Sequence, residues 1–206
     1  MTKISLTQAG KRFNKDWIFS NLDFNFNQGH HYAIIGNNGS GKSTLLQIIA
    51  GYGTLTKGKV AWDGHDDTTI FQDISFAAPY LELVEEFTTL EQFHFHTQFK
   101  PLQKKLAIES IIELIGLKNA TNKQIRYFSS GMKQRLKLAL AIFSDSPILL
   151  LDEPCSNLDK EGYELYSHLI ESYAMHKLII VGSNDTAEYK FCTTHLNLMD
   201  FKSNAI

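Results

Sequence analysis

A lysine and a serine that could hold phosphate and a metal ion follow a glycine-rich run near the start of the chain. Lys42 and Ser43 complete the pattern G-x-x-x-x-G-K-[ST], which begins at Gly36. In this pattern the loop N–H groups and the next helix N-terminus point at phosphate, the lysine reaches the β- and γ-phosphates, and the serine ligates Mg²⁺. The residues expected to contact the nucleotide are Gly36, Asn37, Asn38, Gly39, Ser40, Gly41, Lys42, Ser43 and Thr44.

The segments on either side of this run suit a phosphate loop. The apolar residues 32–35 predict a buried strand that leads into it, and residues 43–50 predict a helix that leads out. Glycine permits the positive φ angles and the close backbone approach that such a loop needs. A glycine turn before an ordinary helix is the alternative, and the flanking strand and helix disfavour it. The run therefore predicts a nucleoside triphosphate site.

Two adjacent carboxylates, Asp152 and Glu153, follow a fully apolar segment at residues 148–151. A buried strand would deliver them to the carboxyl end of a sheet, where open α/β sheets bind ligands. Beside a phosphate loop, an aspartate at this place holds Mg²⁺, and the next glutamate can take a proton from an attacking water. A solvated acidic turn is the alternative reading. We expect Ser43 and Asp152 to bind the metal ion and Glu153 to be catalytic.

A third segment, residues 128–135, places a serine at the start of a predicted helix. Ser129 is a good N-cap, and an apolar stripe follows it at helical spacing. The stripe consists of Leu136, Ala139, Leu140 and Phe143. Taken alone, this pattern indicates only a capped amphipathic helix. Its position gives it meaning, because Gly131 lies 21 residues before Asp152 (152 − 131).

With these three segments in this order, the chain resembles the ATPase subunits of the ATP-binding cassette (ABC) family over nearly its whole length. Residues 128–132 read Phe-Ser-Ser-Gly-Met, which is similar to the Ser-x-Gly-Met signature of many exporter-type subunits. The resemblance implies that two copies pair head to tail, with each ATP between the phosphate loop of one and the signature helix of the other. It therefore implies that Ser129 and Gly131 contact the γ-phosphate across a homodimer interface and that Asp159 links the two sites.

The resemblance also implies a role in transport. ATP and Mg²⁺ are the expected cofactors, and ATP-driven closure of the dimer would power a permease in a separate membrane chain. The subunit is then peripheral, on the cytoplasmic face of the membrane. Two other functions stay open at this point: a slow ATP-dependent clamp or regulatory module with vestigial hydrolysis, and a soluble ABC ATPase with no membrane partner.

An aromatic side chain under the adenine is a further expectation from the resemblance. Phe13 lies where the family places this residue, and Trp17 is the alternate. Phe13 could equally be a core residue, because aromatic side chains mostly serve packing. We therefore predict that Phe13 contacts ATP, and a place in the core is the alternative.

Two positions depart from the family pattern. Where the family has a glutamine that contacts Mg²⁺, this chain has Pro79 or Tyr80, which supply no amide oxygen, and Glu82 is a candidate replacement. Where the family has a histidine that touches the γ-phosphate, this chain has Asn184, which can donate a hydrogen bond but carries no charge. Asn184 could instead cap the helix that follows it. Turnover should be slow if the charge of that histidine matters.

The elements that must position these residues indicate an α/β chain. Further short strands are expected at residues 21–26, 59–62, 74–77, 178–181 and 195–199. Helical spacing dominates from 90 to 117, and strands alternate with helices after 145, which indicates a mostly parallel sheet. Together with the resemblance, this predicts a P-loop NTPase (RecA-like) α/β core with an antiparallel β subdomain and an inserted helical subdomain. In this prediction residues 1–206 form one domain, with 81–144 as the helical subdomain and 1–80 and 145–206 as the rest.

The composition argues against several classes of protein. Lys and Arg total 20 against 22 Asp and Glu, for a net charge of −2, so no nucleic-acid partner is expected. The two cysteines, Cys155 and Cys192, lack the spacing of a disulfide framework or a zinc site. No run approaches the about 20 apolar residues of a membrane-spanning helix, so the permease is expected in another chain.

Overall fold

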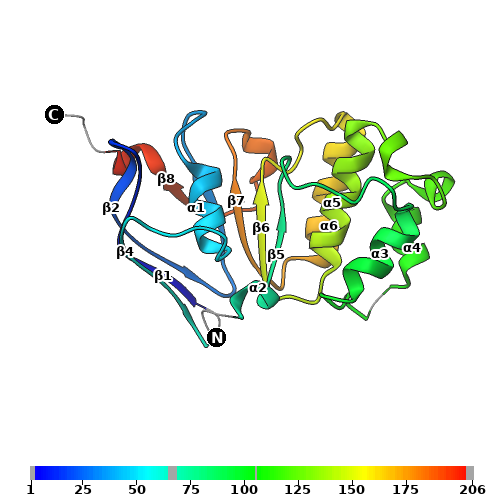
Figure 1. Cartoon of the computed structure of the whole chain (residues 1–206), viewed down its shortest axis with the longest axis horizontal. Coiled ribbons are helices and arrows are strands. Elements are labelled where there is room, and N and C mark those ends of the chain that lie inside the picture. Colours follow the sequence, from blue (N-terminus) through cyan, green and yellow to red (C-terminus); the bar gives the residue numbers. More distant parts are fainter. Residues whose placement is uncertain (1–2, 65–68, 105, 203–206) are drawn as a thin grey trace.

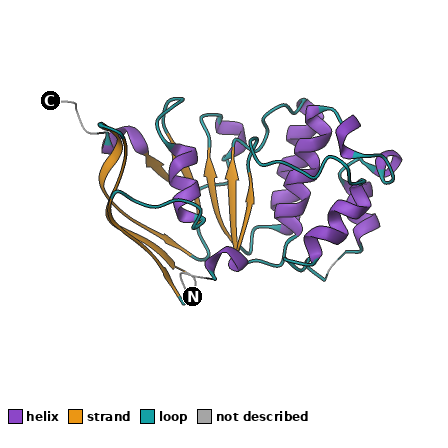
Figure 2. Ribbon diagram, viewed as in Figure 1, coloured by secondary structure: helices purple, strands orange, loops and turns teal. Residues whose placement is uncertain are grey.

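The computed structural model describes residues 3–64, 69–104 and 106–202. A three-stranded antiparallel sheet has the order β2-β1-β4, and a five-stranded parallel sheet has the order β5-β6-β7-β3-β8. Figure 1 shows the antiparallel sheet at one end of the molecule, the parallel sheet in the middle and a group of helices at the other end. Figure 2, in the same view, shows the strands of both sheets in orange and the helices in purple.

The strands are β1 (Lys3–Phe13), β2 (Asp16–Asn27), β3 (His31–Ile35), β4 (Lys57–Asp63), β5 (Ile74–Ala77), β6 (Ile148–Asp152), β7 (Leu178–Gly182) and β8 (Thr194–Asn197). The α-helices are α1 (Lys42–Ile49), α2 (Ile70–Asp73), α3 (Thr89–Thr97), α4 (Ile108–Leu114), α5 (Ser130–Phe143) and α6 (Lys160–Tyr173). Short 3-10 helices span Lys118–Ala120, Ile125–Tyr127, Thr186–Glu188 and Leu198–Phe201.

The parallel sheet is buried on both faces, as its fully apolar strands require. Along β6, Ile148 and Leu150 pack in a core with α1 and the antiparallel sheet. The alternate residues Leu149 and Leu151 pack in a second core with α5 and α6. The sheet therefore holds the carboxyl ends of β3, β6 and β7 at one edge, which fixes where the loops that follow them meet.

Side chains from other elements form hydrogen bonds with the carboxyl end of α5. Lys177, which is 1% exposed, donates to the carbonyl oxygens of Ile142 at 3.0 Å and Ser144 at 2.5 Å. Gln103 donates to Ile142 O at 2.9 Å, and His96 Nε2 lies 2.8 Å from Ser144 Oγ. The contacts of Lys177 and Gln103 satisfy carbonyl groups that a helix end leaves unpaired. Together with the contact of His96, they fasten α5 to both α3 and the start of β7.

The predicted α/β architecture is confirmed, with an antiparallel sheet, a parallel sheet and helices α3, α4 and α5 between β5 and β6. The last predicted strand is too long. β8 ends at Asn197, because the Asn197 side chain accepts a hydrogen bond from Met199 N at 3.1 Å and begins a 3-10 helix. The division at residues 81 and 145, and the single domain of 1–206, stay predictions.

Across the ranges that the structure describes, no helix is both long enough and apolar enough to cross a membrane.

Candidate functional site

The phosphate loop joins β3 to α1 and depends on two glycines for its shape. Gly36 has a φ of 146° and Gly41 a φ of 105°, both in the region that favours glycine. A Cβ at Gly41 would lie 2.2 Å from the Cγ2 atom of Ile18, so a larger residue does not fit there. Gly41 is also the N-cap of α1. The free N–H groups at the start of α1 therefore adjoin the loop, where an anion can accept them.

Lys42 is the first residue of α1, and its ammonium group contacts the loop. Nζ donates to the carbonyl oxygens of Gly36 at 2.8 Å and Asn37 at 3.4 Å, and to Oδ1 of Asn184 at 3.2 Å. The residue is 4% exposed. Burial lowers the pKa of Lys42, while two nearby carboxylates oppose that shift. A buried cation beside free N–H groups is well suited to bind phosphate.

A hollow of about 240 Å³, which we call the phosphate hollow, lies beside the loop. Its lining includes Glu153 from the end of β6 and Ile18 from β2. The other lining residues are Asn38, Gly39, Gly41, Lys42, Ser43 and Thr44. Gly36, Asn37 and Ser40 belong to the loop but not to this lining. The structure thus brings most of the predicted phosphate contacts and the predicted catalytic carboxylate to one place.

Asp152 ends β6 and has the surroundings of a metal ligand. It is 1% exposed, and neither carboxylate oxygen has a hydrogen-bond partner in the described part of the chain. Burial raises the pKa of Asp152, and the nearby hydroxyl groups of Ser43 and Tyr80 oppose that rise. Neither hydroxyl meets the geometry of a hydrogen bond to the carboxylate, and a buried carboxylate whose oxygens accept no hydrogen bond is costly unless a cation meets it. Mg²⁺ commonly takes one or two carboxylates and substrate phosphates as ligands, so Asp152 with Ser43 fits this ion.

Glu153 has a strained backbone conformation between β6 and the hollow. Its φ is 42°, which is rare for a residue with a side chain. Its N–H donates to the carbonyl oxygen of Gly182 at 2.9 Å, which ties this turn to the end of β7. The side chain is exposed and lines the hollow. A strained, exposed acid beside a phosphate loop indicates a functional role for Glu153.

The predicted signature residues line a second hollow of about 360 Å³, which we call the signature hollow. Its lining is Ser129, Ser130, Gly131, Met132, Arg135, Asn157, Leu158 and Asp159. Ser129 caps α5 by accepting from Met132 N at 3.2 Å, and Asp159 caps α6 by accepting from Gly162 N at 2.9 Å. The two hollows share no described residue. One chain therefore does not bring the signature to its own phosphate loop, although Figure 1 shows the amino ends of α1, α5 and α6 at the same edge.

Phe13 is not a core residue, so that alternative is wrong. It is 52% exposed at the end of β1, with Lys11 Nζ 5.1 Å from the ring centroid. Trp17, the alternate, lies beneath the guanidinium of Arg12, whose central carbon is 5.4 Å from the ring centroid. Neither aromatic lines the phosphate hollow, whereas Ile18 does. About half of the Phe13 side chain is nevertheless exposed, so a flat ligand can reach its ring.

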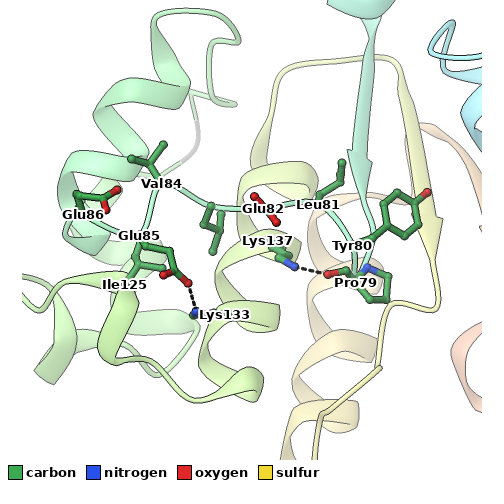
Figure 3. A pocket seen from close by; sticks show the side chains of 11 residues that line it. Pro79, Tyr80, Leu81, Glu82, Val84, Glu85, Glu86, Ile125, Lys133 and Lys137 are labelled. Carbon is green, nitrogen blue, oxygen red and sulfur yellow. Dashed lines mark hydrogen bonds and ion pairs between the residues drawn. The ribbon is translucent and has the colours of Figure 1, made fainter.

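The segment after β5 brings Tyr80, and not Glu82, to Asp152. Burial raises the pKa of Tyr80 to about 12, with its hydroxyl near Gln47 and Asp152. In Figure 3 the Tyr80 ring points away from the groove that Glu82 and Lys137 line. The sequence pattern predicts an amide or carboxylate group at this position and does not point to the tyrosine hydroxyl. Residue type alone could have indicated it, because a phenol can also accept and donate hydrogen bonds.

Asn184 is not the cap of the helix that follows it. Asp185 accepts a backbone hydrogen bond at 2.9 Å and caps the 3-10 helix Thr186–Glu188. Asn184 instead contacts the phosphate loop. Its Oδ1 accepts from Lys42, and its Nδ2 donates to Asn38 Oδ1 at 2.8 Å. The structure therefore places Asn184 beside the predicted phosphate site, as the family pattern requires of the residue at this position.

Comparison with known proteins agrees with this geometry. The ABC transporter family model matches residues 19–156. The ABC transporter ATP-binding protein YybJ of Bacillus subtilis (strain 168) is 34% identical over 188 residues, which cover 88% of this chain and 85% of that protein. The cytochrome c biogenesis ATP-binding export protein CcmA of Xanthomonas campestris is 34% identical over 164 residues, which cover 78% of this chain and 76% of that protein.

A solved structure shares the fold. It is the dimeric post-hydrolysis state of the ATP-binding cassette MJ0796 bound to ADP and Pi, and it matches with a TM-score of 0.80. The identity is 24%, and the match covers 95% of this chain and 94% of that one. Sequence and fold agree: this chain belongs to the ABC transporter family and is an ATP-binding domain of that family.

Proposed function

We propose that this chain is the ATP-binding and ATP-hydrolysing subunit of an ABC transporter, which powers a separate membrane permease through ATP-driven closure of a homodimer. The observation that carries the proposal is the hollow where Lys42, Ser43 and Glu153 meet, next to the unpartnered carboxylate of Asp152. This arrangement offers a cation for phosphate, a hydroxyl and a carboxylate for a metal ion, and a second carboxylate for an attacking water.

The residues of the hollow divide the chemistry among them. The loop N–H groups and Lys42 hold the β- and γ-phosphates. Ser43 and Asp152 would hold Mg²⁺, which would neutralise phosphate charge when bound. Glu153 orients the attacking water and accepts its proton. Asn184 donates an amide N–H to the γ-phosphate but supplies no charge, so we expect slower turnover than a histidine at this position would give.

The second hollow completes the site of a partner copy. Ser129 and Gly131 contact the γ-phosphate held by the other copy's loop, and Asp159 lies between the two sites. The amino end of the 14-residue helix α5 supports this role, because its free N–H groups adjoin a hollow and suit an anion. The fold neighbour MJ0796, which is a dimer, gives further support. Phe13 stacks on the adenine with its exposed ring.

A groove beside α5 supports the membrane partner. It has a volume of about 600 Å³ and lies between the segment after β5 and one face of α5 (Figure 3). Lys133 of α5 pairs with Glu85 at 2.5 Å, and Lys137 of α5 donates to Pro79 O at 2.6 Å. These polar contacts join the two walls of the groove, α5 and the segment after β5. We place the permease contact in this groove, on the cytoplasmic face of the membrane. Export is the favoured direction, given the Ser-x-Gly-Met signature and the relative CcmA, which is named an export protein.

Turnover of Mg-ATP per protomer, measured over a range of protein concentrations, tests the proposal. Glu153→Gln serves as the blank, because its amide cannot accept the proton of the attacking water. We expect turnover per protomer to rise with concentration and to vanish in the variant. Turnover that is the same at every concentration would contradict a site completed by a second copy, and wild-type protein that binds no ATP would contradict the function itself.

A further inference from the structure

The chain turns sharply directly after β6, at Glu153. Ser156 N donates to the carbonyl oxygen of Glu153 at 3.0 Å, which closes a β-turn with Pro154 at its second position. The φ of Glu153, 42°, is rare for a residue with a side chain. Such a conformation persists only where the surrounding structure holds it, so contacts to this turn should fix the place of the Glu153 carboxylate.

The peptide group at the centre of the turn is hydrogen-bonded on both of its polar atoms. Its carbonyl oxygen belongs to Pro154 and accepts from Nε2 of Gln134 at 2.7 Å. Its N–H belongs to Cys155 and donates to Oε1 of Glu188 at 2.7 Å. Gln134 and Glu188 are each 3% exposed, and they come from α5 and from the 3-10 helix after β7. Because the two atoms of a peptide group point in opposite directions, the two side chains fix its orientation from both sides.

Loss of either side chain would release this peptide. Rotation of the central peptide is what separates the common types of β-turn, and it changes the backbone angles beside the first residue, here Glu153. Neither Gln134 nor Glu188 lines the phosphate hollow, so neither contacts the nucleotide there. We propose that Gln134 and Glu188 are positioning residues that hold Glu153 in place for the attacking water, an inference that rests on the proposed function.

Gln134→Leu tests the proposal, with Gln103→Leu as the matched control. Gln103 is also a buried glutamine whose Nε2 donates to a carbonyl oxygen, that of Ile142 at 2.9 Å, but it lies at the carboxyl end of α5. Gln134→Leu should lower turnover at saturating Mg-ATP about 10- to 100-fold, as a misplaced reacting group would, and keep ATP affinity in EDTA within about twofold. Gln103→Leu should keep both. Normal turnover in Gln134→Leu, or equal losses in the two variants, would overturn the proposal.

Exchange of the Cys155 amide hydrogen, followed by NMR, reports on the turn independently of turnover. Its rate is taken relative to that of the Leu150 amide in β6, which removes any change in global stability. In Gln134→Leu this relative rate should rise about tenfold, the scale of one lost hydrogen bond, and in Gln103→Leu it should stay as in the wild type. An unchanged relative rate in Gln134→Leu would overturn the proposal.

Glu188 allows a test by conservative replacement. Glu188→Gln keeps an oxygen that can accept from Cys155 N, whereas Glu188→Leu does not. Turnover should stay within about threefold of the wild type in Glu188→Gln and fall in Glu188→Leu about as far as in Gln134→Leu. Equal turnover in the two Glu188 variants would contradict the proposal. Failure of the proposed function looks different, because the wild-type protein would then bind no ATP, whatever the exchange rate of the Cys155 amide.

Discussion

The two hollows of this molecule differ in what they hold. The phosphate hollow contains a buried cation, Lys42, next to a buried carboxylate, Asp152, that has no hydrogen-bond partner among the described residues. In the signature hollow the polar groups serve their own helices: Ser129 and Asp159 are N-caps, and Arg135 pairs with Asp159 at 3.4 Å. The first hollow is arranged for phosphate and metal, whereas the second offers little beyond helix N–H groups and a serine.

This difference indicates a division of labour. The phosphate hollow has the charge and donors to bind a nucleotide alone. The signature hollow has no buried charged side chain in its lining, because Arg135 is partly exposed and Asp159 is exposed, so we expect it to contribute only once a phosphate is brought to it. Binding should therefore depend on the first hollow, and turnover should depend on both.

Lys42→Ala should have the largest effect. The variant removes the buried cation that we propose contacts the β- and γ-phosphates, so ATP affinity should fall about 100-fold or more, the scale of losing a desolvated charge pair. ATP titration in EDTA measures this, with Lys118→Ala as the control, because that side chain is 69% exposed and its ion pair with Glu113 is worth little. Near-normal affinity in Lys42→Ala would mean that the phosphate hollow does not bind ATP.

Low pH should weaken the contacts that hold the carboxyl end of α5. Burial, and secondarily Lys100, lower the pKa of His96 to about 4. Between about pH 6.5 and 4, the unfolded chain binds a proton at His96 that the folded protein does not, so stability falls as the pH falls. Relative to His96→Gln, the wild type should lose about 2 kcal/mol of unfolding free energy between pH 7 and pH 5. Urea unfolding at the two pH values measures this.

The control for this experiment is His94→Gln, which changes an exposed histidine of the same helix, α3. It should leave the pH dependence of unfolding as it is in the wild type. If the pH dependence of unfolding is the same in His96→Gln and His94→Gln, the pKa of His96 is not lowered by burial. The contacts at the carboxyl end of α5 are then not sensitive to acid.

Gly131→Ala should have the smallest effect of the three, and it should affect turnover alone. A Cβ at this position would lie 3.2 Å from the carbonyl oxygen of Asn157, which crowds the signature hollow without reaching the phosphate hollow. We expect ATP affinity in EDTA to stay within about twofold and turnover to fall about tenfold, as a small misplacement of a contact to the transition state would cause.

Gly53→Ala is the matched control for Gly131→Ala. An added Cβ there would also meet its nearest atom at 3.2 Å, but that atom belongs to the side chain of Ile48. Normal turnover in Gly53→Ala and reduced turnover in Gly131→Ala would locate the effect in the signature hollow. Equal losses would point to general crowding.

The parts of the site that depend on neighbouring residues could be predicted from the sequence. The phosphate loop is contiguous, and Asp152 and Glu153 follow one apolar strand, so residue type and spacing sufficed. Asn184 was assigned two alternative roles because its partners depend on strand pairing. Gly182 of β7 lies opposite Ile34 of β3, and only this parallel register sets the segment after β7 beside the phosphate loop.

The same limit applies to the fold. β1 was not located from the sequence, because its register with β2 shifts between Leu6 and Ala9 and again beyond Ala9. Such bulges interrupt the alternation of buried and exposed residues by which a strand is recognised. The end of β8 was misplaced for a local reason, because Asn197 begins a 3-10 helix within an apolar stretch that also suits a strand.

The central claim is that the two hollows are halves of one site contributed by two copies. Mixing Lys42→Ala with Gly131→Ala tests it most directly, because a mixed dimer holds one site with an intact loop and an intact signature. Turnover of the mixture should exceed the mean of the separate variants and approach about a quarter of wild type, since half of randomly formed dimers are mixed and each has one of two sites intact. Turnover no greater than that mean would contradict the claim.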